Sequence, residues 1–172
     1  MAEIEDVFGR SSLAVRVRGA TLQDTAGILL CLRSAFAPYQ ALYTPGAFED
    51  TVLTPELLDQ RLKAMTVFVA ETNTRQIIGT IACSVISKVE GHLRGMGVLP
   101  AWQGRGVAKA LLQRTEDELS HLGCEQVTLD TTEPLVSAMR FYERNGFRRT
   151  GKISDFFGMS LIEYAKQLRE PN

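Results

Sequence analysis

Cysteine and histidine are scarce in this chain of 172 residues. Cys31, Cys83 and Cys124 form no CxxC pair, and His92 and His121 form no ligand cluster with them. This pattern argues against a disulfide framework and a metal site, and it predicts three small buried apolar residues in a reducing, cytoplasmic setting. No apolar run approaches the roughly 20 residues of a membrane helix. The acidic N-terminus lacks the regions of a signal peptide, so we expect no membrane association.

The chain also lacks an excess of charge of either sign. Its 19 basic and 20 acidic residues give a formal net charge of -1. Proteins that bind nucleic acid by counterion release carry surplus positive charge, so we expect no nucleic acid partner. The length fits one domain. We expect a flexible N-terminal arm over residues 1–12 and a single domain over residues 13–172.

Hydrophobic periodicity predicts an α+β fold. Seven strands are expected, at 13–18, 67–71, 77–85, 92–98, 126–130, 147–150 and 159–164. Four helices are expected, at 21–36, 55–65, 104–122 and 134–145, and residues 38–51 read as a connecting loop. Hairpins mixed with β-α-β units predict a mixed, mostly antiparallel central sheet with helices on both faces.

The densest chemical signal lies between residues 95 and 112, where a strand ends and small residues open a helix. The first N–H groups of a helix lack internal partners, and the helix dipole adds positive potential there, so such an end binds phosphate. Gly104, Gly106 and Ala108 let a phosphate approach the backbone closely, and Arg105 and Lys109 add positive charge.

Two other interpretations of this segment stay open on the residues alone. Gly104 and Gly106, with Asp130 at the end of the next strand, resemble part of a dinucleotide fingerprint and suggest a nucleotide-binding protein. That fingerprint has a third glycine where this chain has Lys109, and it needs repeated β-α-β units. The second interpretation is a glycine-rich turn that serves packing only.

Two motifs in order resemble those of the GNAT superfamily of N-acetyltransferases. The segment Gln103-Gly-Arg-Gly106-Val-Ala108 resembles the family's [Q/R]xxGx[G/A] motif, and Gly97-Val-Leu-Pro100 resembles the strand end before it. Ala138-Met-Arg-Phe-Tyr142-Glu-Arg-Asn-Gly-Phe147 resembles its AxxFYxxxGF motif. The resemblance spans residues 14 to about 165 and implies the acyl-CoA N-acyltransferase (GNAT) fold, with acetyl-CoA as co-substrate.

The resemblance also implies where the co-substrate binds. The strands 92–98 and 126–130 would splay at a bulge, and the pantetheine arm would lie in the gap against the backbone of Val98. The pyrophosphate would bind the backbone N–H groups of Gln103, Gly104, Arg105, Gly106, Val107 and Ala108. The family often has a cofactor-binding asparagine at the position of Leu135, so that contact is absent here.

Two residues are the catalytic candidates. Tyr142 matches the family tyrosine that faces the cofactor sulfur, where a phenol can protonate the departing thiolate. His92, six residues before Val98, is the candidate base that takes a proton from the amine. Arg94 and Met96 are expected on the same strand face as His92. Glu71 and Glu90 are the weaker candidates for the base.

The acceptor amine is expected beside the first helix pair and the last hairpin. Tyr39, Tyr43 and Phe48 offer aromatic surface there, Glu49 and Asp50 could attract a cation, and residues 155–158 could form the opposite wall. The sequence therefore predicts an N-acetyltransferase that moves an acetyl group to a primary amine, by direct attack in a ternary complex, on a small-molecule acceptor. A protein or peptide N-terminal amine and a non-catalytic acyl-CoA-binding module stay open, as do a longer acyl donor and a homodimer.

Overall fold

A seven-stranded sheet runs through residues 14–168, the part of the chain that the computed structural model describes. The expected arm over 1–12 lies outside these residues. The strands are β1 (Val15–Gly19), β2 (Thr66–Thr72), β3 (Ile77–Val85), β4 (Glu90–Val98), β5 (Gln126–Thr132), β6 (Arg148–Phe156) and β7 (Met159–Gln167). They lie in the order β1-β2-β3-β4-β5-β7-β6, and only β4 and β5 pair in parallel. The predicted mixed, mostly antiparallel sheet is confirmed.

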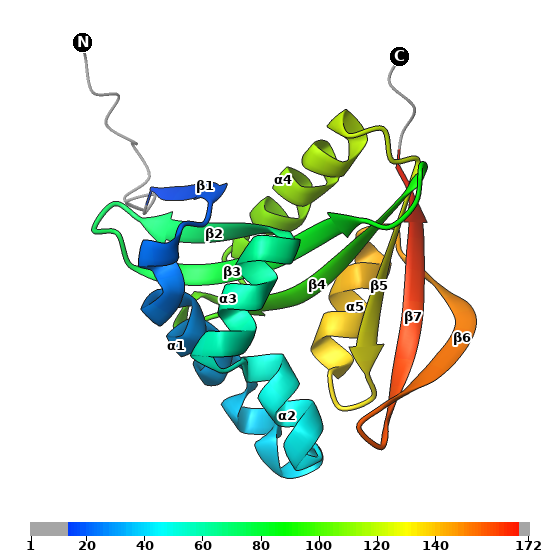
Figure 1. The fold of residues 1–172 in the computed structure, drawn as a ribbon, viewed down its shortest axis with the longest axis horizontal. Helices are drawn as coiled ribbons and strands as arrows, with labels where there is room; N and C mark the ends of the chain where they lie inside the picture. Colours follow the sequence, from blue (N-terminus) through cyan, green and yellow to red (C-terminus); the bar gives the residue numbers. More distant parts are fainter. Residues whose placement is uncertain (1–13, 169–172) are drawn as a thin grey trace.

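Helices cover both faces of this sheet, as predicted (Figure 1). They are α1 (Thr25–Phe36), α2 (Pro45–Val52), α3 (Pro55–Ala64), α4 (Val107–His121) and α5 (Val136–Arg144). On one face, Ile28 and Leu32 of α1 and Leu58 of α3 bury themselves against Val69 and Ala82 of the sheet. α4 packs on the opposite face, so two apolar layers enclose the sheet.

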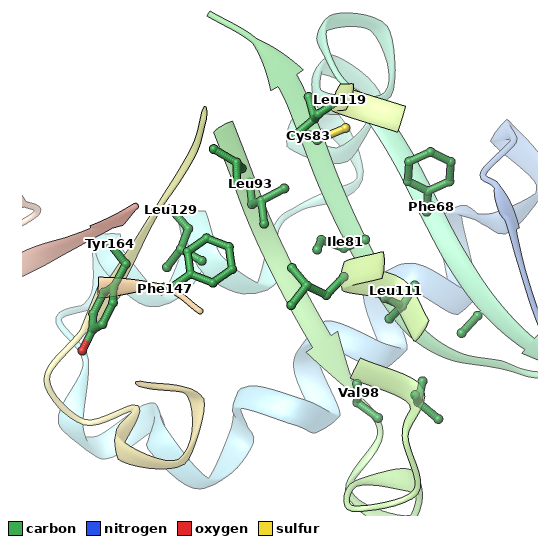
Figure 2. Close-up of a cluster of buried hydrophobic side chains, with 14 of the residues drawn as sticks. Phe68, Ile81, Cys83, Leu93, Val98, Leu111, Leu119, Leu129, Phe147 and Tyr164 are labelled. Atoms are coloured by element: carbon green, nitrogen blue, oxygen red, sulfur yellow. The ribbon is translucent and has the colours of Figure 1, made fainter. Parts of the chain in front are cut away.

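The larger core lies between the sheet and α4 (Figure 2). Leu111 and Leu119 of α4 are fully buried against this face, which also carries Ile81 and Leu93. Each such side chain contributes about 1.5–3 kcal/mol when removed from water. Leu122, the last residue of the predicted 104–122 helix, is 51% exposed, because α4 ends at His121. The three cysteines are buried and unpaired, as predicted.

The largest difference from the sequence prediction lies between α1 and α3, where a loop was expected. A 3-10 helix (Ala37–Leu42) and α2 occupy this stretch. α2 starts as α3 does, with a threonine followed by proline. Thr44 accepts a hydrogen bond from the Ala47 N–H, and Thr54 accepts one from the Leu57 N–H. A threonine cap followed by proline therefore indicates a helix start at residue 44 as well as at residue 54.

β4 and β5 separate halfway along their length (Figure 1). Their pairing runs only from Glu90 to Leu93 on β4. The β3–β4 register shifts beyond this point, and Gly95 adopts a φ of +65°, which favours glycine. The bulge also reverses the side-chain alternation: Met96 packs toward the α4 core, while Arg94 pairs with Asp50 of α2. The prediction that Arg94 and Met96 share a strand face is therefore wrong.

Candidate functional site

A cavity of about 780 Å³ opens where β4 and β5 separate. This volume is in the range of pockets that hold small molecules and cofactors. Seven of the nine residues proposed from the sequence line it, namely His92, Val98, Gln103, Gly104, Gly106, Ala108 and Tyr142. Two do not. Val107 is buried in the core, and the Arg105 guanidinium lies 5.2 Å from the centre of the Trp102 ring.

One end of the cavity is a row of free backbone N–H groups at the start of α4. Gly104 and Gly106 have φ values of +74° and +83°, and a Cβ on either glycine would meet nothing within 4 Å. Within residues 14–168, the N–H groups from Gly104 to Ala108 donate no hydrogen bond. Free N–H groups at the positive end of a fifteen-residue helix form a site for an anion.

Gln103 closes the turn between β4 and this row. Its side-chain amide donates to the Val98 carbonyl at 3.0 Å, and its backbone N–H donates to the Pro100 carbonyl at 3.3 Å. The backbone N–H of Gln103, proposed from the sequence as an anion donor, is thus already engaged. The structure instead gives Gln103 a role in shaping the turn.

Tyr142 lines the middle of the cavity from α5. Its ring packs edge-on against Phe141 and Phe147, at centroid distances of 5.5 and 5.7 Å. No described residue makes a hydrogen bond to its hydroxyl. Burial raises the pKa of Tyr142 above that of an ordinary phenol, so the hydroxyl keeps its proton at neutral pH. A protonated, unpartnered phenol facing a cavity is ready to donate.

His92 lies on the β4 wall and is held from β5. Its Nδ1 is 2.9 Å from the Thr128 hydroxyl, and its Nε2 is 3.6 Å from Asp130 Oδ2. If the Thr128 hydroxyl donates to the Gly91 carbonyl, 3.5 Å away, its oxygen accepts from Nδ1–H, and in this tautomer the lone pair lies on Nε2. Burial lowers the pKa of His92, against the opposing effect of Asp130, and the ring is neutral at pH 7.

Glu71 and Glu90, the weaker base candidates, do not line the cavity. Glu71 is buried and bonds Arg16 and Arg18 at 2.7 and 2.9 Å. These two guanidinium groups lower its pKa to about 2. Glu71 is therefore a permanently charged member of an ion-pair network between β1 and β2.

The other end of the cavity, where the sequence predicts the acceptor, has aromatic walls. Tyr39 and Tyr43 line it from the α1–α2 connection, and Phe156 lines it from the β6–β7 hairpin. The Tyr43 hydroxyl lies 2.6 Å from the Thr132 hydroxyl. Phe48 does not line the cavity and packs on Tyr43 instead.

Two contacts join the walls at this end. The Thr44 hydroxyl donates to the Phe157 carbonyl at 2.7 Å, and a Cβ on Gly46 would collide with the Phe157 ring. α2 and the β6–β7 turn therefore touch beside this end of the cavity. Asp50, proposed from the sequence to attract a cation, already forms an ion pair with Arg94 at 2.6 Å.

Sequence reasoning missed three lining residues with clear chemistry: Asp130 beside His92, Thr131 and Arg61. His92 pairs with Thr128 in the parallel β4–β5 register, and Asp130 lies two residues further along β5, so this register would have indicated it. Thr131 is 4% exposed, and its hydroxyl has no hydrogen-bond partner among the described residues. Nothing local in the sequence marks either Thr131 or Arg61, because both depend on how distant elements meet.

Among residues 14–168, no three His, Cys, Asp or Glu side chains gather in a way that would hold a metal ion. None of the described helices has both the length and the apolar character needed to cross a bilayer.

A splayed β4–β5 pair, a free helix start and a lined cavity are the features that the sequence resemblance to the GNAT superfamily implies. The chain matches the family model for the acetyltransferase (GNAT) family over residues 32–147. This match covers about two thirds of the sequence, and the chain belongs to that family, whose members are transferases.

Solved structures share the fold at low identity. A paia N-acetyltransferase from Thermoplasma acidophilum in complex with coenzyme A is 19% identical, with a TM-score of 0.73 over 90% of this chain and 99% of that one. The ribosomal-protein-S18-alanine N-acetyltransferase from Escherichia coli is 17% identical, with a TM-score of 0.74 over 92% and 97%. A GNAT family acetyltransferase from Elizabethkingia anophelis with acetyl-CoA bound is 17% identical, with a TM-score of 0.65 over 90% and 98%.

Proposed function

We propose that this protein transfers an acetyl group from acetyl-CoA to the primary amine of a small molecule. The observation that carries the proposal is that one cavity joins the free N–H groups of α4, the Tyr142 hydroxyl and the His92 imidazole. An anion site, an acid and a base in this order match the parts of a thioester-to-amine transfer. Coenzyme A and acetyl-CoA in the Thermoplasma and Elizabethkingia structures support the same donor.

The anion site would hold the pyrophosphate of the donor. Gly104, Arg105, Gly106, Val107 and Ala108 offer unpaired N–H groups, and the two glycines leave open space above the backbone. From there the pantetheine arm would enter the gap between β4 and β5 and pass Val98. Acetyl-CoA supplies the activated acetyl group, as a thioester.

The chain's own residues would move the protons. His92 takes a proton from the acceptor amine through its Nε2 lone pair, directly or through one water. The amine nitrogen then forms its bond to the acetyl carbon, and the carbon–sulfur bond breaks. Tyr142 gives its phenol proton to the departing thiolate, and the second proton that the nitrogen loses on becoming an amide restores the phenol. The nitrogen gains the acetyl group, and the free thiol leaves.

Direct attack by the amine is favoured over an acyl-enzyme. None of Cys31, Cys83 and Cys124 lines the cavity. Burial raises the pKa of Cys31 to about 12 and that of Cys83 to about 11, so neither thiol forms the reactive thiolate at neutral pH.

A small acceptor is favoured because α2 and the β6–β7 turn touch across the acceptor end. The Thr44–Phe157 hydrogen bond and the Gly46–Phe157 contact narrow the opening through which a polypeptide would enter. The Escherichia coli relative of the fold is named for a protein acceptor, so a peptide beginning with alanine belongs in the test.

The test is release of free thiol from acetyl-CoA in the presence of primary amines, with mass spectrometry of the acceptor. We expect an acetylated small amine and little turnover of the peptide. Faster turnover of the peptide than of the small amines would show that the acceptor is a protein or peptide amine and not a small molecule. No acetylation of any amine, together with tight acetyl-CoA binding, would favour a non-catalytic acyl-CoA-binding module.

A further inference from the structure

Arg61 of α3 is a cation inside the cavity without an anion. Its side chain lines the cavity and is half-buried. The guanidinium lies directly on the backbone of Gly95, where a Cβ would overlap Nη1. Among residues 14–168, no carboxylate lies within ion-pair distance of Arg61 and no group accepts a hydrogen bond from its guanidinium. The five donors of this group therefore have no protein partner in the described structure.

The neighbouring charges do not neutralise Arg61. Asp50 is close, but its carboxylate bonds Arg94 at 2.6 Å. Arg61, Arg94 and Asp50 together carry one net positive charge. Burial, followed by repulsion from Arg94, lowers the pKa of Arg61 to about 10, so the guanidinium is still charged at neutral pH. A partly buried charge of this kind is stabilised by a bound anion.

We infer that Arg61 binds the carboxylate of the acceptor, and that the acceptor is therefore an amino acid. This inference rests on the proposed acetyl transfer and names its substrate class. The planar guanidinium fork matches a carboxylate with two parallel hydrogen bonds. One net positive charge also matches a carboxylate better than a phosphate, which carries nearly two negative charges.

The spacing along β4 fits a short molecule between Arg61 and His92. Gly95 lies three positions after His92, so their Cα atoms are about 10 Å apart at the rise of a strand. A hydrogen bond of about 3 Å at each end leaves room for only a few atoms between the guanidinium and the imidazole. An amine and a carboxylate one or two carbons apart fit in this space. Asp130, 3.6 Å from His92 Nε2, lies at the amine end, where it attracts the ammonium form.

The alternative is an arginine whose aliphatic stem covers α3 and whose head group bonds water. Arg61→Met separates the two, because methionine keeps most of the stem and removes the charge. Arg33→Met is the matched control, since Arg33 is an exposed arginine of α1 outside the cavity. Arg61→Lys keeps the charge and removes the fork.

The experiment measures kcat/KM for α-amino acids, each beside its own primary amide, with acetyl-CoA saturating. The wild type and Arg33→Met should prefer the acids by about 10- to 100-fold, the range of a charge-assisted hydrogen bond. In Arg61→Met the ratio of kcat/KM on each acid to that on its amide should fall to about one, and Arg61→Lys should recover part of the preference.

Equal rates on acids and amides in the wild type, or an unchanged preference in Arg61→Met, would overturn the inference while leaving acetyl transfer intact. If no amine is acetylated, the proposed function fails instead. Calorimetric binding of the same amino acids to the protein–CoA complex then decides about Arg61. Binding that Arg61→Met weakens at least tenfold supports the carboxylate site, and equal or absent binding refutes it.

Discussion

In the protein without ligand, the hydroxyl of Thr131 should destabilise the fold. When acetyl-CoA binds, the same hydroxyl should help to hold it. It is 4% exposed on β5, lines the cavity and has no hydrogen-bond partner among the described residues. An unsatisfied buried hydroxyl costs about 1–3 kcal/mol. Thr131→Val removes the hydroxyl, keeps the shape and keeps a strand-forming residue.

Without ligand, Thr131→Val should therefore raise the free energy of unfolding by about 1 kcal/mol, or the Tm by about 2–4 °C for a chain of this size. A pantetheine amide in the gap between β4 and β5 would satisfy the hydroxyl. The variant should then bind acetyl-CoA about three- to tenfold more weakly, the value of one ordinary hydrogen bond.

Thr80→Val is the matched control. Thr80 is 1% exposed in β3, and its hydroxyl donates to the Phe68 carbonyl at 3.0 Å, outside the cavity. This variant should lower the free energy of unfolding by about 1 kcal/mol and leave acetyl-CoA affinity unchanged. Differential scanning calorimetry and titration calorimetry measure both quantities. If Thr131→Val loses stability as Thr80→Val does, the Thr131 hydroxyl is not unsatisfied in the free protein. If it keeps full affinity for acetyl-CoA, the hydroxyl does not bind the donor.

Two further predictions concern the proton transfers. Tyr142→Phe should lower kcat by about 10²- to 10⁴-fold while the Kd for acetyl-CoA stays the same, because the hydroxyl has no partner in the described protein; an unchanged kcat where chemistry is limiting would defeat the acid role. In the wild type, kcat/KM should rise with pH through an apparent pKa below the usual histidine value, because burial lowers the pKa of His92 and the base must be neutral. Asp130→Asn should move this rise to still lower pH, because the Asp130 carboxylate raises the pKa of His92, and His92→Gln should remove the rise. A pH profile that survives in His92→Gln would show that another group is the base.

Local signals predicted most of the fold. Thr21 and Asp24 open the predicted 21–36 helix, and the Thr21 N–H donates to Asp24 at 2.8 Å, as in a capping box. Strand alternation and glycine stops gave all seven strands of the sheet. The prediction failed where two local signals conflicted, as at α2, whose aromatic and glycine content favoured a loop although Thr44 and Pro45 start a helix.

The site was predicted less completely, because it depends on where distant segments meet. The motif around Gly104 and Gly106 is contiguous, so its position at a free helix start was readable from the sequence. The bulge at Gly95 inverts the strand alternation, so the sequence prediction put Met96 on the wrong face of β4. Arg61 reaches the cavity from α3 only because Gly95 has no side chain, a contact that no local pattern encodes.

Calorimetric titration with acetyl-CoA, CoA and NADH shows whether the start of α4 holds the donor's pyrophosphate. The comparison is between the wild type, Gly106→Glu and Gly123→Glu. Gly106 and Gly123 lie at opposite ends of α4, with φ values of +83° and +90° and open space around both. Both variants thus carry the same backbone strain, but only Gly106→Glu puts a carboxylate on the anion site. We expect the wild type and Gly123→Glu to bind acetyl-CoA and CoA, and Gly106→Glu to bind neither. Binding that survives in Gly106→Glu, or a wild-type preference for NADH, would contradict a pyrophosphate site at the start of α4.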